Sequence, residues 1–510
     1  MIMMAVVFGA IMLGSSTVAL FGGFGNKNSA QTTDTTITGT PADNYKDKDR
    51  PTFCETSDHA KSNKYITEFK IPTACTQPLG ITTDPSENVW FTESNTGNIA
   101  KFVPSTKNFT EYTNPLWQSH EKSMMWGIGY APDGNIWYTD SGHNLIWKFS
   151  PIDEKYADFS YPKTPGQREV FPQMLVINGK EILINDFAGR KITSFNVDQV
   201  GSTIDYSTIS SSGNYNFTSD MAVDSNGKIW YTVWIYQQGG NLVRYDPETG
   251  NKTQFNLPPG ILAPNGMSID QDGKIWVTDT ASSIFFSFDQ QSQQFTKFIT
   301  PLPIESTYGN ASGLIKTPIS RPYWNQVDDN GRVWFIEQVA NSIGVFDPAK
   351  NSLVEYLVPS TNPNWSDCGA LQDCGVAQVL GLTTREDKVW FTEWVENNIG
   401  FLDPKIPLPI DVSTTPTDII FHRGENSTIS FTITPNEQII DPLSIVTANT
   451  ANANDLIVSS NPQVTMTGQP KTVSISISAD NFALTGTYKV LIGARYHEVT
   501  ISKYVTVTIK

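Results

Sequence analysis

The segment VWFTESNTGNIAKF at residues 89–102 returns as VWFTEWVENNIGFL at residues 389–402. Two similar segments so far apart indicate an internal repeat, and a repeat largely decides the fold of the chain that contains it. The shared part is a short hydrophobic stretch, in most copies followed by Thr and a carboxylate, and we call it the marker segment. Seven marker segments are present, and they contain Trp90, Trp137, Leu183, Trp230, Trp276, Trp334 and Trp390.

Each marker segment belongs to a unit of four short stretches in which hydrophobic and polar residues alternate. A turn such as DSNGK (224–228) precedes the marker, a stretch such as NSIGVFDP (341–348) follows it, and a stretch such as LVEYLVP (353–359) ends the unit. Alternation of this kind predicts β-strands. Seven units of four antiparallel strands predict a seven-bladed β-propeller, because closing the ring protects the strand edges.

The ends of the repeat predict how the ring closes. The seventh unit has no closing strand, since the chain leaves it through KIPLPI (405–410). The segment KYITEFKIP (64–72) resembles the closing strands of the other units, but it precedes the first of them. We therefore predict a propeller over residues 64–404 in which residues 64–72 complete the last blade.

The segments outside the repeat predict a C-terminal domain, an N-terminal hydrophobic segment and a linker. Residues 409–510 contain no Trp and alternate with period two, which predicts a C-terminal β-sandwich of immunoglobulin-like type and makes the whole chain all-β. Residues 1–24 are uncharged and largely hydrophobic, which predicts a signal peptide or an N-terminal membrane anchor. The polar residues 25–63 predict a flexible linker.

Charge and cysteine content narrow the classes of function. The chain has 51 Asp and Glu against 35 Lys and Arg, for a net charge of -16, and this charge repels nucleic acids. An even number of cysteines in an exported chain predicts disulfides. The four are Cys54, Cys75, Cys368 and Cys374. Two arrangements are open: a bridge from Cys75 to Cys368 or Cys374 across the ring closure, or the local pairs Cys54–Cys75 and Cys368–Cys374.

Six Asn-x-Ser/Thr tripeptides agree with a secreted or cell-surface glycoprotein. They begin at Asn108, Asn216, Asn251, Asn310, Asn364 and Asn426. Together with the hydrophobic N-terminus they predict an extracellular location, with contact to the membrane only through residues 1–24.

The units GITTDPSENVWFTESNTGNIAKF (80–102) and GLTTREDKVWFTEWVENNIGFL (381–402), with YITEFKIPT (65–73), resemble the virginiamycin B lyase family of streptogramin-opening enzymes. PNGMSIDQDGKIWVTDT (264–280) also resembles gluconolactonase-like propellers. The lyase resemblance implies catalytic histidines at the starts of the innermost strands of blades six and seven. Tyr323 and Leu380 occupy these positions here, and Glu393 is a rough match for a further family Glu. Imidazole transfers protons near neutral pH, whereas Leu cannot and Tyr does so poorly. The lyase mechanism is therefore not predicted.

The resemblance to the lyase family also implies which residue of each blade lies at the mouth of the central channel. In blade order these are Leu79, Trp126, Gln173, Asp220, Asn265, Tyr323 and Leu380. The four consecutive polar residues form one arc, and the apolar residues form the opposite arc. Such a site suits a small molecule. We predict ligand binding by Gln173, Asp220, Asn265, Tyr323 and Trp126, and Asp220 beside Asn265 could hold Ca²⁺ or Mg²⁺.

Two other clusters have simpler interpretations. The marker carboxylates are Glu93, Asp140, Asp186, Asp279, Glu337 and Glu393. A group repeated in nearly every blade favours a structural role, as an acceptor of hydrogen bonds, over cation binding.

His143, with His120 and Glu121, forms a weaker candidate for a metal or acid–base site.

These observations predict an exported or surface-anchored propeller that binds a small molecule, a glycan or a cell-surface protein at the channel mouth. The alternative is an enzyme of the lyase or lactonase type that is assisted by a divalent metal ion. The two hypotheses differ in whether Asp220, Asn265 and Tyr323 only bind or also react.

Overall fold

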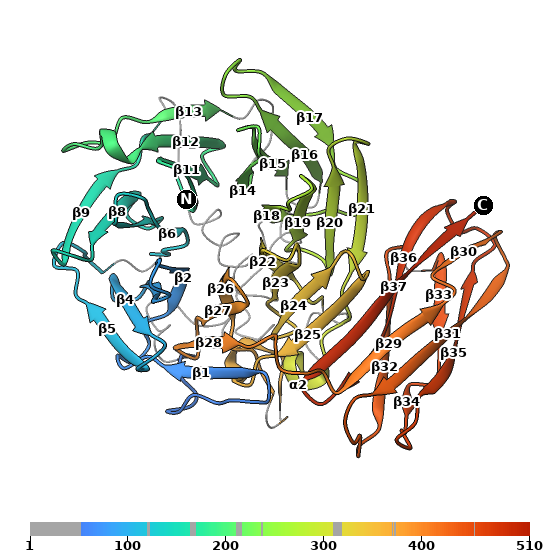
Figure 1. The fold of residues 1–510 in the computed structure, drawn as a ribbon. Helices are drawn as coiled ribbons and strands as arrows, with labels where there is room; N and C mark the ends of the chain where they lie inside the picture. Colours follow the sequence, from blue (N-terminus) through green and yellow to red (C-terminus); the bar gives the residue numbers. More distant parts are fainter. Residues whose placement is uncertain are drawn as a thin grey trace, which may run out of the picture.

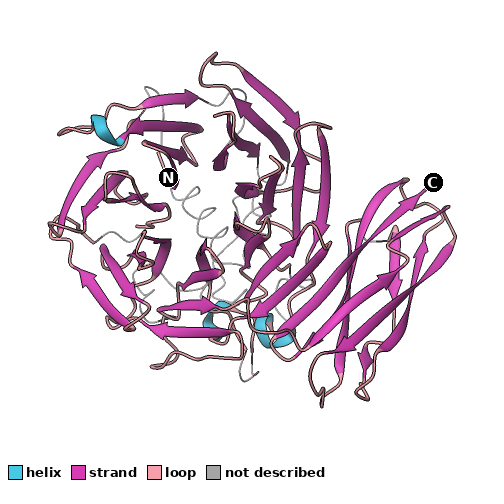
Figure 2. Ribbon diagram, in the orientation of Figure 1, coloured by secondary structure: helices cyan, strands magenta, loops and turns pink. Residues whose placement is uncertain are grey.

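The computed structural model describes residues 53–510 except 120–122, 164–169, 211–216, 236–237, 310–318, 370, 372–373 and 453. A ring of short sheets surrounds a central axis, and a second β-unit lies beside it (Figures 1 and 2). The predicted signal peptide or anchor and residues 25–52 of the predicted linker lie outside the described residues. Within the described part of the chain, no helix is long and apolar enough to cross a membrane.

Seven blades of four antiparallel strands form the ring, each running from the axis outward. Blade one contains β2 (Pro78–Thr83), β3 (Val89–Glu93), β4 (Asn98–Val103) and β5 (Asn108–Tyr112); blade two β6 (Ile128–Tyr130), β7 (Ile136–Asp140), β8 (Leu145–Ser150) and β9 (Lys155–Ser160); blade three β10 (Pro172–Asn178), β11 (Glu181–Asp186), β12 (Lys191–Asn196) and β13 (Ser207–Ser210); blade four β14 (Phe217–Val223), β15 (Ile229–Ile235), β16 (Gly239–Tyr245) and β17 (Lys252–Asn256). Blade five contains β18 (Pro264–Ile269), β19 (Ile275–Asp279), β20 (Ile284–Asp289) and β21 (Gln294–Ile299); blade six β22 (Pro322–Val327), β23 (Val333–Glu337), β24 (Ser342–Asp347) and β25 (Ser352–Leu357); blade seven β26 (Val379–Arg385), β27 (Lys388–Glu393), β28 (Asn398–Leu402) and β1 (Ile66–Lys70). The described helical turns are η4 (Val197–Gln199), α2 (Glu305–Tyr308) and η5 (Pro363–Trp365).

The marker segment explains why the units assemble. Its hydrophobic residues pack between blades, its Thr bonds to the next blade, and its Trp bonds to the preceding turn. Its alternate hydrophobic residues are buried between blades. In four blades its Thr hydroxyl donates to a main-chain carbonyl on, or just before, the innermost strand of the next blade, which joins the blades around the ring. These bonds are Thr92 to Met125 (2.7 Å), Thr139 to Gln173 (2.6 Å), Thr232 to Pro264 (3.0 Å) and Thr392 to Leu79 (2.8 Å).

The marker tryptophan is held by the turn that precedes it. In five blades its indole N–H donates to an Asp of that turn, which also accepts main-chain N–H groups and so orders the hairpin. The pairs are Trp90–Asp84 (2.9 Å), Trp137–Asp133 (3.2 Å), Trp230–Asp224 (2.9 Å), Trp276–Asp270 (2.9 Å) and Trp334–Asp328 (2.7 Å). The marker segment is therefore scaffold, and functional differences between blades are expected elsewhere.

The N-terminal strand closes the ring. Strand β1 lies antiparallel to β28, with Ile66 opposite Leu402 and Lys70 opposite Asn398. Because β28 comes from the last blade and β1 precedes the first, blade seven is built from both ends of the repeat.

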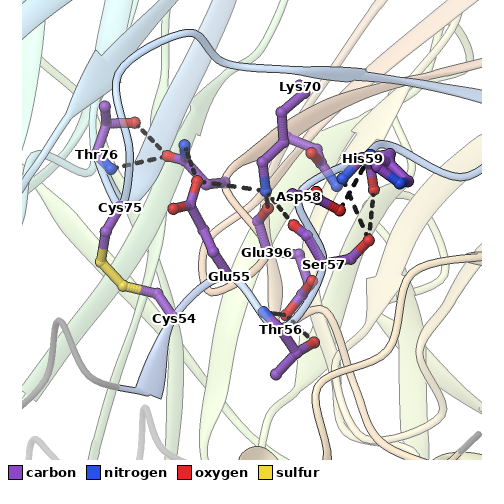
Figure 3. A network of polar contacts seen from close by, with 12 residues as sticks. Cys54, Glu55, Thr56, Ser57, Asp58, His59, Lys70, Cys75, Thr76 and Glu396 are labelled. Atoms are coloured by element: carbon purple, nitrogen blue, oxygen red, sulfur yellow. Dashed lines mark hydrogen bonds and ion pairs between the residues drawn. A yellow bond between two sulfur atoms is a disulfide. The ribbon is translucent and has the colours of Figure 1, made fainter.

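Residues 53–63, which belong to the predicted linker, pack against blade seven (Figure 3). The Glu55 N–H donates to the Val395 carbonyl (2.8 Å), and the Thr56 N–H and hydroxyl donate to Glu396 (3.2 and 2.9 Å). A disulfide joins Cys54 to Cys75, and the second disulfide is Cys368–Cys374. The cysteines thus form the two local pairs, and the bridge across the closure is not made.

The C-terminal unit consists of two sheets packed around a hydrophobic core (Figure 2). One sheet contains β29 (Ile410–Thr415), β31 (Asn426–Pro435), β35 (Lys471–Ala479) and β33 (Leu456–Ser459). The other contains β30 (Asp418–Phe421), β37 (Val499–Ile509), β36 (Gly486–Tyr496), β32 (Leu443–Asn449) and β34 (Gln463–Val464). The chain is therefore all-β, and the immunoglobulin-like type of the sandwich remains a prediction.

The C-terminal unit is joined to the propeller by hydrogen bonds between strands. Strand β37 pairs with β25, the outermost strand of blade six, from Ser352 opposite Lys503 to Tyr356 opposite Val499. Blade six therefore continues into one sheet of the C-terminal unit, which gives a sheet of nine strands (Figure 1). This pairing covers the exposed edge of blade six, so the unit is a lateral extension of the propeller.

Candidate binding site on the propeller axis

The innermost strands carry the residues that were predicted at the channel mouth. Strands β2, β6, β10, β14, β18, β22 and β26 follow each other around the axis, and β26 lies beside β2. The seven predicted residues therefore lie in the expected order, but none of them is more than 6% exposed. The structure places them inside the ring, as a buried cluster on, or just before, the innermost strands.

An aromatic contact crosses the axis within this cluster. The ring centroids of Trp126 and Tyr323 lie 6.1 Å apart in an edge-to-face arrangement. Because Trp126 precedes β6 of blade two and Tyr323 begins blade six, these side chains come from opposite sides of the ring. The predicted apolar and polar arcs therefore touch at this level, whereas the sequence analysis treated them as facing walls.

Asp220 is the ionisable group of the cluster. Its carboxylate accepts the main-chain N–H of Met221 (2.8 Å) and a hydrogen bond from the N–H of Met267 on the neighbouring β18. Burial raises the pKa of Asp220 to about 7, against the opposing effect of these two hydrogen bonds. Burial also raises the pKa of Tyr323, and the charge of Asp220 raises it further, which shows that the two groups are close.

Three donors of the cluster lack an acceptor within the described part of the chain. They are Gln173 Nε2, Trp126 Nε1 and Tyr323 Oη. The orientation of Gln173 is set by Asn185, which donates to Gln173 Oε1 (3.3 Å). A buried donor without an acceptor costs about 1 to 3 kcal/mol, so an acceptor that reached these three donors would stabilise the cluster. We call Trp126, Gln173, Asp220, Asn265 and Tyr323 the axial cluster.

Asp220 and Asn265 remain a two-residue candidate for Ca²⁺ or Mg²⁺. The described residues contain no group of three or more His, Cys, Asp and Glu side chains that could hold a metal ion. Such cations prefer six or more oxygen ligands, and Asp220 already accepts two N–H groups. A cation here would therefore depend on main-chain oxygens and water.

The marker carboxylates have the structural role that their repetition favoured. Asp140 accepts hydrogen bonds from Ser123, His143 and Trp147, and Asp279 accepts the N–H groups of Leu262 and Ala263. His143 is thus paired with a structural carboxylate at 2.8 Å, while His120 and Glu121 lie outside the described residues.

Three buried marker carboxylates each lie close to a second Glu, and the sequence patterns used above did not predict these contacts. Each lies within hydrogen-bonding reach of a second Glu on the outermost strand of the same blade, and burial raises the pKa of each marker Glu. The pairs are Glu93–Glu111 in blade one, Glu337–Glu355 in blade six and Glu393–Glu68 in blade seven. The pKa of Glu93 is raised to about 8 and that of Glu355 to about 7.

The repeat contains a signal for these pairs. The second Glu lies in FTEY, LVEY and ITEF, and it occurs in the blades whose marker residue is Glu rather than Asp. The residue opposite it on the intervening strand is Ala100, Gly344 or Gly400, and the ring of Phe335 or Phe391 lies against the two glycines. In blades two, four and five the equivalent residues are Trp147, Val243 and Phe286.

The two positions at which the lyase family has catalytic histidines hold no acid–base pair in this chain. Leu380 is buried and apolar, and Tyr323 contacts Trp126. Glu393 accepts a hydrogen bond from Asn398 (2.8 Å) and pairs with Glu68, so it belongs to the scaffold. Three further tryptophans, Trp234, Trp365 and Trp394, are also buried.

Comparisons with known proteins agree with this fold. Residues 56–286 match the model of the virginiamycin B lyase family. Among solved structures, virginiamycin B lyase from Staphylococcus aureus is 20% identical, with a TM-score of 0.53 over 68% of this chain and 99% of that chain. A streptogramin B lyase is 21% identical, with a TM-score of 0.52 over 66% and 97%. A catalytically inactive histidine-to-alanine variant of the Staphylococcus aureus lyase, with quinupristin, is 19% identical, with a TM-score of 0.52 over 68% and 99%. No curated protein matches the chain by sequence.

Proposed function

This chain carries a virginiamycin B lyase-like β-propeller, and on that premise we propose that it is an extracellular binding protein that holds a small polar molecule at the axial cluster. The observation that carries the proposal is the set of three buried donors without an acceptor on, or just before, the innermost strands, one of which, Tyr323, lies near Asp220. A ligand rich in acceptor oxygens would satisfy these donors, and Trp126 and Tyr323 would supply aromatic contact.

The burial of the cluster favours a small molecule over the other predicted partners. A glycan chain or a protein surface needs an exposed face, whereas these residues are at most 6% exposed. A small molecule can reach them only when the side chains that bury them move, so we expect binding to shift the conformation of Trp126 and Tyr323.

The two disulfides support a location outside the reducing cytoplasm. Exposed sequon residues Asn108, Asn251 and Asn426 are compatible with glycosylation there. Anchoring by residues 1–24 remains a proposal, because that segment lies outside the described residues.

Binding at the axial cluster is tested with a panel of small sugars, lactones and carboxylic acids by thermal shift and calorimetry. We expect at least one class to bind, and Tyr323→Phe or Gln173→Leu to weaken it three- to tenfold, because each variant removes one uncharged donor. Thr110→Val on the exposed part of β5 is the control. A ligand that binds all variants equally would place the site elsewhere.

Metal binding at the axial cluster is tested separately. A rise in melting temperature with Ca²⁺ or Mg²⁺ that chelation reverses and Asp220→Asn removes would establish the metal.

An enzyme of the lyase or lactonase type is the second candidate, and Asp220 is the observation that favours it. A carboxyl with a pKa of about 7 is present in both protonation states near neutral pH, as a general acid or base requires. Opening of a streptogramin or simple lactone ring that follows the titration of Asp220 and is lost in Asp220→Asn would establish this candidate. Turnover that persists in Asp220→Asn would exclude Asp220 as the reacting group.

A further inference from the structure

A second candidate site lies between blades seven and one, at the end of the innermost strands away from the axial cluster. A cavity of about 160 Å³ opens beside the turns that join β26 to β27 and β2 to β3. Its walls include the aromatic rings of Phe69, Trp390 and Phe401. Arg385, Lys388 and Glu87 also line it. We call it the blade-seven cavity.

The cavity arises where blade seven departs from the repeat. In blade one the turn reads TTDPSENVW, but in blade seven it reads TTREDKVW, which is one residue shorter and has Arg385 where the other turn has Asp84. Arg385 pairs directly with Lys388, so Glu386 and Asp387 alone close the hairpin. The side chain of Asp387 faces Arg332 (3.5 Å) and Lys405 (3.3 Å) and is not available to the marker tryptophan.

Trp390 therefore lacks the acceptor that the other marker tryptophans have. In five blades the indole N–H donates to a turn Asp at 2.7 to 3.2 Å. Trp390 is 3% exposed, lines the cavity and has no hydrogen-bond acceptor for its indole within the described residues. The indole N–H of Trp390 is not enclosed by protein atoms, so at the cavity wall it can donate to water or to an acceptor that comes from outside the chain.

The charge at the cavity is positive, although the chain as a whole is acidic. Lys388 is paired with Glu87 at 2.5 Å, so these two charges offset each other. The hydrogen bond from Lys388 lowers the pKa of Glu87, and the charge of Arg385 lowers it further. Arg385 donates one hydrogen bond to the Asp84 carbonyl (2.8 Å), but in the described part of the chain it forms no ion pair with a carboxylate. The guanidinium fork is therefore open to a carboxylate, which it binds with good geometry.

We propose that the blade-seven cavity binds a small aromatic carboxylate. The ring lies among Phe69, Trp390 and Phe401, and the carboxylate accepts hydrogen bonds from Arg385 and the Trp390 indole. The size fits, because a cavity of about 150 Å³ with apolar walls accommodates a benzene ring. The site is independent of the axial cluster, so either can be present without the other.

Benzoate is the probe, titrated into the full-length protein by calorimetry and by tryptophan fluorescence. We expect one saturable site, about tenfold weaker binding to Arg385→Gln, and a smaller loss with Trp390→Phe, which keeps an aromatic ring but removes the N–H. Benzyl alcohol, which has the ring without the charge, is expected to bind at least tenfold more weakly. Lys274→Gln, in the equivalent turn of blade five where Asp270 holds the tryptophan, is the matched control and keeps full affinity.

Three results would overturn the proposal: no saturable binding of benzoate to the unaltered protein, equal binding of benzyl alcohol and benzoate, or unchanged affinity in Arg385→Gln. If Trp390→Phe unfolds, Thr83→Phe at the edge of the cavity replaces it, because it reduces the space for the ring without touching either donor. Full affinity in that variant would also contradict the proposal.

Discussion

The free energy of unfolding is expected to fall as the pH rises from about 5 to about 9, by several kcal/mol in total. The reason is a set of buried carboxyls whose pKa values are raised: the marker residues Glu93, Glu337 and Glu393, the second residues Glu68 and Glu355, and Asp220 on the axis. Burial favours the neutral form of these carboxyls in the folded protein. Deprotonation places a negative charge where water is excluded and, in the pairs, beside a second carboxyl.

The sign follows from the direction of the shifts. A carboxyl whose pKa is higher in the folded than in the unfolded chain stabilises the fold fully below the unfolded value, near 4. That stability is lost as the pH rises through the folded values of about 7 for Glu355 and about 8 for Glu93. His143, whose pKa the Asp140 hydrogen bond raises, contributes in the same direction. Carboxylates with lowered pKa values, such as Asp140, lose their contribution only in stronger acid.

The pair in blade six allows a sharp test. Glu337 and Glu355 face each other and Arg495 of β36, whose charge lowers the pKa of both carboxyls and offsets part of the effect of burial. Glu337→Gln replaces the proton-sharing pair by an amide that donates to Glu355. We expect this variant to lose about 2 to 3 kcal/mol less than the unaltered protein between pH 5 and 9.

Urea unfolding at successive pH values measures both proteins, with Glu154→Gln in an exposed turn as the control. Stability that is constant or rises over this pH range would show that the pairs are relaxed or hydrated in solution.

The propeller could be predicted because its information is local and repeated. Three positions of the marker segment each make a specific contact. The tryptophan bonds to the turn, the Thr to the next blade, and the carboxylate to the turn at the end of its strand. The resemblance of residues 64–72 to other closing strands similarly predicts the pairing of β1 with β28. The carboxyl pairs also leave a signal in the sequence, because the Glu of FTEY, LVEY or ITEF occurs in the blades whose marker residue is Glu.

Contacts between parts that are not repeated could not be predicted in this way. Alternation shows which face of β37 is buried, but it does not show that the edge of this strand pairs with β25. The position of a residue on an innermost strand likewise does not show how far its side chain reaches. Trp126 and Tyr323 are long enough to meet across the ring, and the order of the blades alone does not predict this contact.

The second large effect is expected where the C-terminal unit meets the propeller. Tyr504 of β37 is 1% exposed, and its ring packs edge-to-face on Phe298 of blade five (5.2 Å) and Phe346 of blade six (5.6 Å). Its hydroxyl donates to the Ile299 carbonyl at 2.8 Å. One side chain therefore links the C-terminal unit to two blades.

Tyr504→Ala is expected to cost about 3 to 5 kcal/mol, because it leaves a cavity among aromatic rings and a buried carbonyl without its donor. Since β37 also pairs with β25, the loss should weaken the coupling between the two units, and calorimetric unfolding should separate into two transitions. Tyr504→Phe keeps the ring and should lose only about 1 kcal/mol. Tyr488→Ala, on the neighbouring β36 and half-buried, is the matched control. If Tyr504→Ala lowers the stability but still unfolds in one transition, the strand pairing alone would couple the propeller to its extension.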